Sequence, residues 1–157
     1  MSGLFDDLRD LYQEVILDHG RKPRNFRRLE NADLTARGDN PMCGDRMELF
    51  LKTASNGTIA ETAFQGRGCA ISMASASLMT ETVKGKSPAQ AREIGEAFRT
   101  LAMTGTCPDC GGDLADEMER LTPLSGVHEF PSRVKCATLA WHTLNAALDG
   151  GKEASSE

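Results

Sequence analysis

The Asn56-Gly57 pair is the feature that most constrains the fold of this 157-residue chain. It separates two runs, at residues 47–52 and 59–64, whose side chains alternate as they do along a strand. Both central positions of a two-residue hairpin turn need positive φ, which Asn and Gly adopt readily. We therefore expect a β-hairpin whose first strand begins, and second strand ends, at one edge of a sheet. Because Cys43 precedes the first strand and Cys69 follows the second, these thiols can meet there.

Helical patterns account for most of the remaining chain. Residues 4–16 carry apolar side chains at three- and four-residue steps, with Ser2 as a candidate N-cap and Gly20 as the expected stop. Ser87 starts another helix, because a proline and a capping-box glutamine follow it. Less regular patterns predict a short strand near residues 34–37 and helices near residues 70–84, 114–121 and 132–148.

The length and charge of the chain limit what it can be. A chain of this length is typical of a single domain. We place this domain at residues 1–150 and expect residues 151–157 to form a disordered tail. A net charge of -5 argues against a nucleic-acid binder. Without a long apolar run or a secretory pattern, we expect a cytoplasmic protein that binds no membrane. Five basic residues form either solvated surface or a docking site for an acidic partner: Arg21, Lys22, Arg24, Arg27 and Arg28.

Three cysteines and one aspartate are candidate metal ligands. Cys43 and Asp45 stand two residues apart just before the first hairpin strand, and Cys69 opens the helix after the second. A helix N-terminus stabilises a thiolate. Cys136 lies on the final helix, away from the face that carries Val134 and Trp141, so we expect it outside the main core. Three thiolates and a carboxylate would complete a tetrahedral zinc site; the alternative is three unrelated buried cysteines.

Two further cysteines stand apart from these positions. Cys107 and Cys110 resemble one half of a zinc ribbon, but the chain has no second pair of that spacing. They are either spare thiols, a redox-active pair, or a second metal site that includes His128.

Three separated segments resemble one known family. These are NPMCGDR at residues 40–46, GRGCAISMASAS at residues 66–77 and FPSRVKCAT at residues 130–138. They are similar to the U-type iron–sulfur cluster assembly proteins, and most similar to their SufU branch. The scaffold branch, IscU-like proteins, carries a histidine directly before the third cysteine, where this chain has Lys135. The resemblance implies an α+β single domain with a three-stranded antiparallel sheet and helices packed on one side.

The resemblance also implies a function and its residues. It implies a zinc-dependent sulfurtransferase with Zn²⁺ held by Cys43, Asp45, Cys69 and Cys136, and with Cys43 as the sulfur acceptor. The sulfur would come from a SufS-type cysteine desulfurase and pass to the SufBCD assembly complex. We assign a supporting catalytic role to Arg133, although a plain surface arginine is the alternative. Two other functions stay open: a scaffold for a [2Fe-2S] cluster, and an adaptor that only activates the desulfurase.

Overall fold

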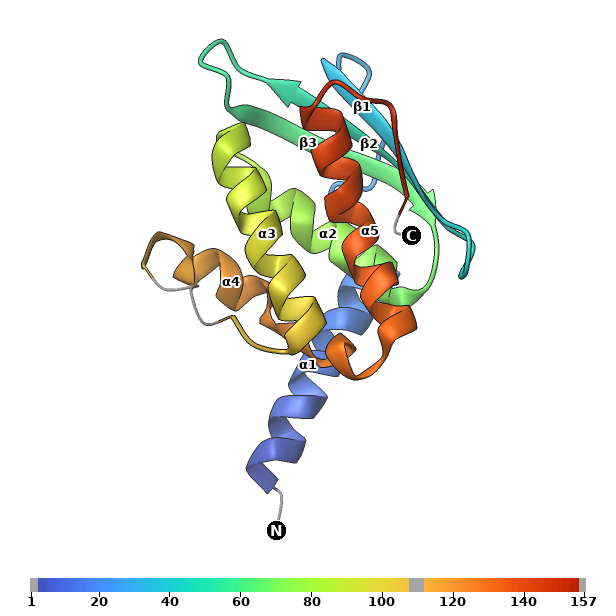
Figure 1. The fold of residues 1–157 in the computed structure, drawn as a ribbon, viewed down its shortest axis with the longest axis vertical. Helices are drawn as coiled ribbons and strands as arrows, with labels where there is room; N and C mark the ends of the chain where they lie inside the picture. Colours follow the sequence, from blue (N-terminus) through green and yellow to red (C-terminus); the bar gives the residue numbers. More distant parts are fainter. Residues whose placement is uncertain (1–2, 108–111, 156–157) are drawn as a thin grey trace.

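The computed structural model describes residues 3–107 and 112–155, and the side chains of its first helix from Tyr12 onward. A sheet lies behind a group of helices (Figure 1). In chain order the elements are α1 (Gly3–Arg21), β1 (Leu34–Asn40), β2 (Asp45–Thr53), β3 (Ile59–Arg67), α2 (Ala70–Val83), α3 (Pro88–Thr104), α4 (Ala115–Leu121), α5 (Pro131–Leu148) and β4 (Glu153–Ser155), with short 3-10 helices at Gly112–Leu114 and Thr122–Glu129.

The sheet is mixed and has four strands in the order β3-β2-β1-β4. The three antiparallel strands that the resemblance implied are present, but β4 adds a fourth, parallel to β1. The prediction of a three-stranded, all-antiparallel sheet was therefore wrong. The additional strand comes from the segment that we expected to be a disordered tail. It pairs because the outer edge of β1 presents unpaired backbone groups; for example, the Arg37 amide donates to the Lys152 carbonyl oxygen at 2.8 Å.

The predicted hairpin is confirmed by the pairing of β2 with β3. Leu49 lies opposite Phe64 in the register. The predicted turn geometry was wrong: Gly57 has φ of +88°, but Asn56 does not have positive φ. The loop is longer than two residues, with the Ala54 amide donating to the Thr58 carbonyl oxygen at 2.8 Å and the Gly57 amide donating to the Ala54 carbonyl oxygen at 2.9 Å. The hairpin places the first residue of β2, Asp45, near the last residue of β3, Arg67. The entry and exit of the hairpin thus lie at one edge of the sheet, as the sequence predicted.

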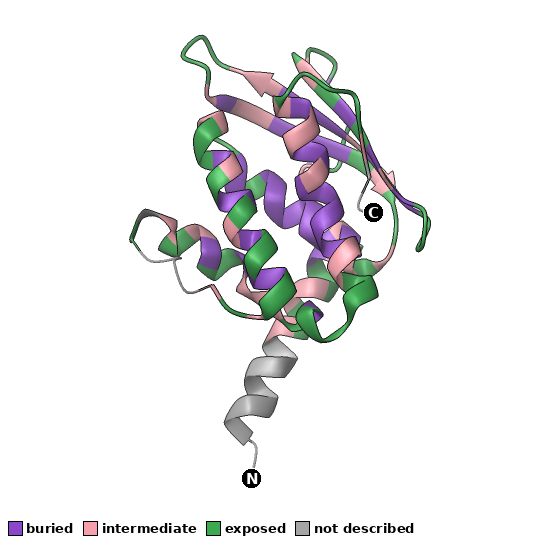
Figure 2. Cartoon of the chain, in the orientation of Figure 1, coloured by how far each residue is buried: buried purple, intermediate pink, exposed green. Residues whose placement is uncertain are grey.

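The core lies between the sheet and the helices, where α2 and α5 pack on one sheet face and α3 packs on α5 (Figure 2). Phe98 of α3 stacks on Trp141 of α5 with ring centroids 5.2 Å apart. Part of the opposite face is covered by the loop after α1, where Leu29 packs on Phe50. Burial of these apolar side chains is the main force that holds the layers together.

Local sequence patterns predicted the other helices with one clear error. The capping box of α3 is present, with the Ser87 hydroxyl accepting from the Gln90 amide at 3.1 Å. Gly20 does not stop α1, which continues to Arg21. A Cβ built on Gly20 would lie 3.3 Å from the Ala70 Cα, so the glycine allows α1 and α2 to approach closely. The predicted N-cap, Ser2, lies outside the described residues.

Candidate metal centre

The site begins where β1 ends and β2 starts. Asn40 and Asp45 lie opposite each other in the β1–β2 register, on the face that the helices cover, and both are 0% exposed. Between them the chain makes a tight turn, in which the Asn40 carbonyl oxygen accepts from the amides of Cys43 at 3.2 Å and Gly44 at 2.8 Å. Gly44 has φ of +72°, which favours glycine. This turn holds Cys43 at the rim, where it is exposed.

The Asp45 carboxylate is held by two donors. Its Oδ1 accepts from the Cys69 backbone amide at 3.0 Å, and its Oδ2 accepts from the Asn40 Nδ2 at 3.1 Å. Cys69 is the N-cap residue of α2, and its side chain makes no capping hydrogen bond. Gly68 lies directly against the Asp45 side chain, because a Cβ at this position would collide with it. Backbone and side chain thus fix the carboxylate before any metal binds.

Cys136 reaches the same site from α5. We expected it to lie outside the main core, but it is 0% exposed, so that expectation was wrong. The face of α5 opposite Trp141 is covered by β1, a contact that helical periodicity alone does not reveal. The ligand atoms of Cys43, Asp45 and Cys136 lie within 4.8 Å of one another. Cys69 is not a member of that group, although its backbone contacts Asp45.

Burial and neighbouring charge shape the chemistry of these groups. Burial, and then the neighbouring Asp45 carboxyl and Cys69 thiol, raise the pKa of the Cys136 thiol above its ordinary value. Negative charge on Cys69, followed by contact with Cys136, raises the pKa of Arg133, an exposed residue of the first turn of α5. Because burial and its neighbours disfavour the charged form, the Cys136 thiol is difficult to ionise unless a cation lies close by.

The donor set suits a thiophilic divalent cation. Asp45 is fully buried, and no Lys, Arg or His of the described residues forms an ion pair with it. A buried carboxylate of this kind needs a compensating positive charge. Cysteine sulfur and carboxylate oxygen are common zinc ligands, and three such atoms already converge. The residues present therefore fit a zinc ion.

The second cysteine pair does not join this site. Cys107 is disulfide-bonded, and its Sγ lies 3.8 Å from the Ala97 carbonyl oxygen. Cys110 lies outside the described residues, so the structure leaves a redox role for the pair untested. His128 bonds the Ser125 carbonyl oxygen through Nδ1 at 2.8 Å. Within the described part of the chain, the Cys43 group is the only cluster of potential metal ligands.

The basic loop after α1 is partly engaged within the molecule. Arg24 pairs with Asp18 at 2.6 Å, and its amide donates to the Ser77 hydroxyl at 2.8 Å. The same hydroxyl lies 2.7 Å from His19 Nδ1, which is buried. This contact joins α1 to α2. Burial, and then the Arg24 charge, lower the pKa of His19.

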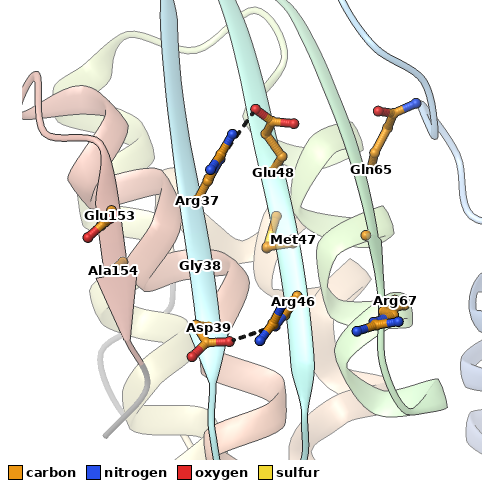
Figure 3. Close-up of a pocket in the computed structure, with 11 residues that line it drawn as sticks. Arg37, Gly38, Asp39, Arg46, Met47, Glu48, Gln65, Arg67, Glu153 and Ala154 are labelled. Atoms are coloured by element: carbon orange, nitrogen blue, oxygen red, sulfur yellow. Dashed lines mark ion pairs between the residues drawn. The ribbon is translucent and has the colours of Figure 1, made fainter.

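A charged groove lies on the opposite face of the sheet (Figure 3). Most of its charges are paired within the groove itself: Arg37 with Glu48 at 3.8 Å, and Arg46 with Asp39 at 3.4 Å (Figure 3). These side chains point away from the cysteines because neighbouring residues of a strand alternate between its faces. The groove is thus separate from the metal centre.

Asn40 is the residue of this site to which sequence reasoning assigned no role. It stands in the NPMCGDR segment, three positions before Cys43, but an asparagine at the end of a strand has no distinctive pattern. Its amide donates toward Asp45 and lies 3.7 Å from the Cys136 Sγ. Only the strand register and the packing of α5 show this contact.

The chain is similar to known proteins in family, sequence and structure. Residues 11–153 match the model of the NifU-like N terminal domain. The chain is 43% identical to the zinc-dependent sulfurtransferase SufU of Bacillus subtilis, over 90% of this chain and 92% of that protein. It is 36% identical to the iron-sulfur cluster assembly scaffold protein IscU of Streptococcus pyogenes, over 90% and 84%. A crystal structure described as a candidate scaffold protein of the SUF system, from Fervidobacterium islandicum, matches with a TM-score of 0.77, 32% identity and coverage of 86% and 94%. None of the helices in the described residues could cross a membrane.

Proposed function

The chain belongs to the family of NifU-like N-terminal domains, the U-type iron–sulfur cluster assembly proteins, and on that premise we propose that it is a zinc-dependent sulfurtransferase. One observation supports this function above the others: in a cluster of three candidate ligands, Asp45 and Cys136 are fully buried whereas Cys43 is exposed. A purely structural metal site has no need of an accessible sulfur. A site that passes sulfur between proteins requires one.

We propose a ligand set of Cys43, Asp45, Cys69 and Cys136. The first, second and fourth of these already converge, and the backbone amide of Cys69 lies against the Asp45 carboxylate. The Cys69 side chain starts at the N-terminus of α2, where free amides favour a thiolate. Bound zinc would supply the positive charge that keeps these thiols deprotonated.

The sulfur-transfer step is assigned to Cys43. Its thiolate attacks the outer sulfur of a persulfide on the donor protein, because thiolates rather than thiols are the nucleophiles in such exchange. A sulfur–sulfur bond forms on Cys43 as the donor's bond breaks, and the electron pair leaves with the donor's cysteine thiolate. The exposed position of Cys43 allows the donor to approach, whereas the thiol of Cys136 is fully buried and shielded from water.

Arg133 supports this step from the first turn of α5. Negative charge on Cys69 and contact with Cys136 raise the pKa of Arg133, which is consistent with a guanidinium close to both sulfurs. We assign it the role of stabilising these sulfurs when Cys43 moves. Its exposed position also lets it contact an incoming partner. We therefore keep Arg133 as a supporting residue of the transfer, together with Cys43.

The proposed partners follow from the persulfide chemistry. The sulfur donor would be a SufS-type cysteine desulfurase and the recipient the SufBCD assembly complex, in the cytoplasm. This assignment is supported by the similarity to a protein named as a zinc-dependent sulfurtransferase. The alternative, a scaffold for a [2Fe-2S] cluster, is supported by the similarity to proteins named as IscU scaffolds and uses the same three cysteines.

One experiment separates these functions. Protein purified without added metal is analysed for zinc, iron and sulfide, then incubated with desulfurase and cysteine and examined by mass spectrometry. Zinc, together with one added sulfur atom on the peptide that contains Cys43, is the expected result. Iron and sulfide would support the scaffold, and zinc with faster desulfurase turnover but no adduct would support the adaptor. Cys43→Ser should lose the adduct, whereas the neighbouring exposed control Met42→Leu should keep it.

A further inference from the structure

Asn40 connects the parts of the metal centre that come from different elements. Its backbone carbonyl holds the turn that carries Cys43, and its side-chain amide lies 3.1 Å from Asp45 Oδ2 and 3.7 Å from Cys136 Sγ. One buried residue thus contacts a strand, a loop and α5 at the site. The turn amides would be held by any residue in this backbone conformation, but only the Asn40 side chain reaches Asp45 and Cys136.

The two ends of the Asn40 amide are not used equally. Nδ2 faces a carboxylate and a sulfur, while Oδ1 is buried and has no hydrogen-bond partner among the described residues. Rotating the amide by half a turn would place its oxygen against these electron-rich atoms, so the orientation is fixed by its neighbours. Leaving a buried acceptor without a partner is unfavourable. This arrangement indicates that the residue serves the site through its two N–H groups.

The N–H groups distinguish among the proposed ligands. A hydrogen bond donated to a metal-bound carboxylate or thiolate orients the ligand and holds it in place. Asp45 and Cys136 have such a donor in Asn40, and both are fully buried. Cys43 is exposed, and the hydrogen bonds of the Asn40 side chain go to Asp45 and Cys136 rather than to the Cys43 sulfur.

We propose that Asn40 is a positioning residue of the metal centre, which retains Asp45 and Cys136 as fixed ligands so that Cys43 is the ligand that leaves. This inference rests on the proposed zinc centre and deepens it, because it explains which sulfur can be released. It concerns the order of ligand exchange, whereas the sulfur transfer itself is assigned to Cys43.

The test compares zinc-loaded wild type with Asn40→Ala and Asn40→Leu, of which the second nearly preserves the side-chain volume. Zinc affinity is measured by competition with a chromophoric chelator, and the first cysteine alkylated by iodoacetamide is identified by mass spectrometry. In the wild type Cys43 should react first. In both variants zinc binding should be about 10- to 100-fold weaker, and Cys136 should become alkylated together with Cys43.

A matched control separates this role from a loss of stability. Thr62 is buried on β3, and its hydroxyl donates to the Thr80 carbonyl oxygen at 2.8 Å. Thr62→Val therefore also removes one buried hydrogen bond, but at a position that lies opposite Leu51, six residues along β2 from Asp45. It should lower stability and leave zinc affinity and the alkylation order unchanged. Asn40 variants that bind zinc like the wild type, with Cys43 still first, would overturn the proposal.

A measurement on the wild type covers the case in which the variants do not fold. The side-chain amide resonances of Asn40 are followed by NMR during titration with zinc, and both should shift and exchange more slowly with water. Unchanged resonances at full zinc occupancy would overturn the role of Asn40 without affecting sulfur transfer.

Conversely, zinc binding with the expected alkylation order but no sulfur adduct would refute the proposed function and leave the role of Asn40 intact. A wild type that takes up no zinc would refute both.

Discussion

The inner face of the sheet has two ends that use the same strands for different purposes. At one end Leu49, Leu51 and Phe64 are fully buried among apolar side chains. At the other end Asn40 and Asp45 are equally buried but are surrounded by hydrogen-bond donors and thiols. The apolar end lowers the free energy of the folded state without any ligand. The polar end contains a buried carboxylate that needs a cation, so its stability depends on what binds there.

The largest expected effect tests the apolar end alone. Phe64→Ala removes a fully buried ring that also packs edge-on against Phe26, and it should lower the free energy of unfolding by about 3–5 kcal/mol. Urea unfolding followed by Trp141 fluorescence measures the loss. The folded fraction should still bind one zinc ion. If zinc binding fell while stability did not, the two ends would not be separate. Phe130→Ala, at a position 59% exposed, is the control and should change stability little.

The next effect tests the polar end through removal of the metal. At free zinc about 100 times its dissociation constant, binding to the folded state alone adds about 2.7 kcal/mol, which a chelator should abolish. In Asp45→Asn the chelator should make almost no difference, because the carboxylate ligand is absent. Urea unfolding with and without chelator measures both values. Equal responses of wild type and variant to the chelator would contradict the assignment of Asp45.

A smaller effect tests how precisely the carboxylate at the polar end must be placed. Gly68→Ala places a methyl group against the Asp45 carboxylate, and overpacking of this kind costs about 1–3 kcal/mol. Zinc affinity should fall as well, because the carboxylate must move. Gly126→Ala is a matched control, since its Cβ would meet no heavy atom within 4 Å. Unchanged zinc affinity in Gly68→Ala, measured by chelator competition, would show that the position of Asp45 is not critical.

The smallest effect concerns pH and a region outside both ends. Burial lowers the pKa of His19 below its ordinary value of about 6.5, so below that pH the unfolded chain binds a proton that the folded chain resists. Metal-free protein should therefore lose stability as the pH falls from about 6.5 toward the lowered pKa. His19→Gln should show a shallower loss in urea unfolding, with His142, whose pKa burial also lowers, unchanged in both proteins. Identical pH profiles would contradict this role.

Local patterns were sufficient for most of the elements and for part of the site. Asn56-Gly57 determined the hairpin, and the hairpin brought the segments of Cys43 and Cys69 to one edge of the sheet. The capping box determined the start of α3. These features depend on residues close in the chain, so their energetics can be inferred without knowledge of the rest of the fold. The four-ligand set and the role of Arg133 remain predictions.

Contacts between distant segments decided what local patterns could not. Helical periodicity suggested that Cys136 lies outside the core, yet β1 covers that face of α5 and buries the thiol completely. The fourth strand formed because the edge of β1 offered backbone partners to a C-terminal segment with no strand pattern of its own. Asn40 acquired its contacts only through the strand register and the position of α5. The sequence by itself determined most of the elements and the types of ligand, since these follow from neighbouring residues. Only the tertiary structure decided which thiol is buried and which is exposed, because burial depends on every element that packs around a residue.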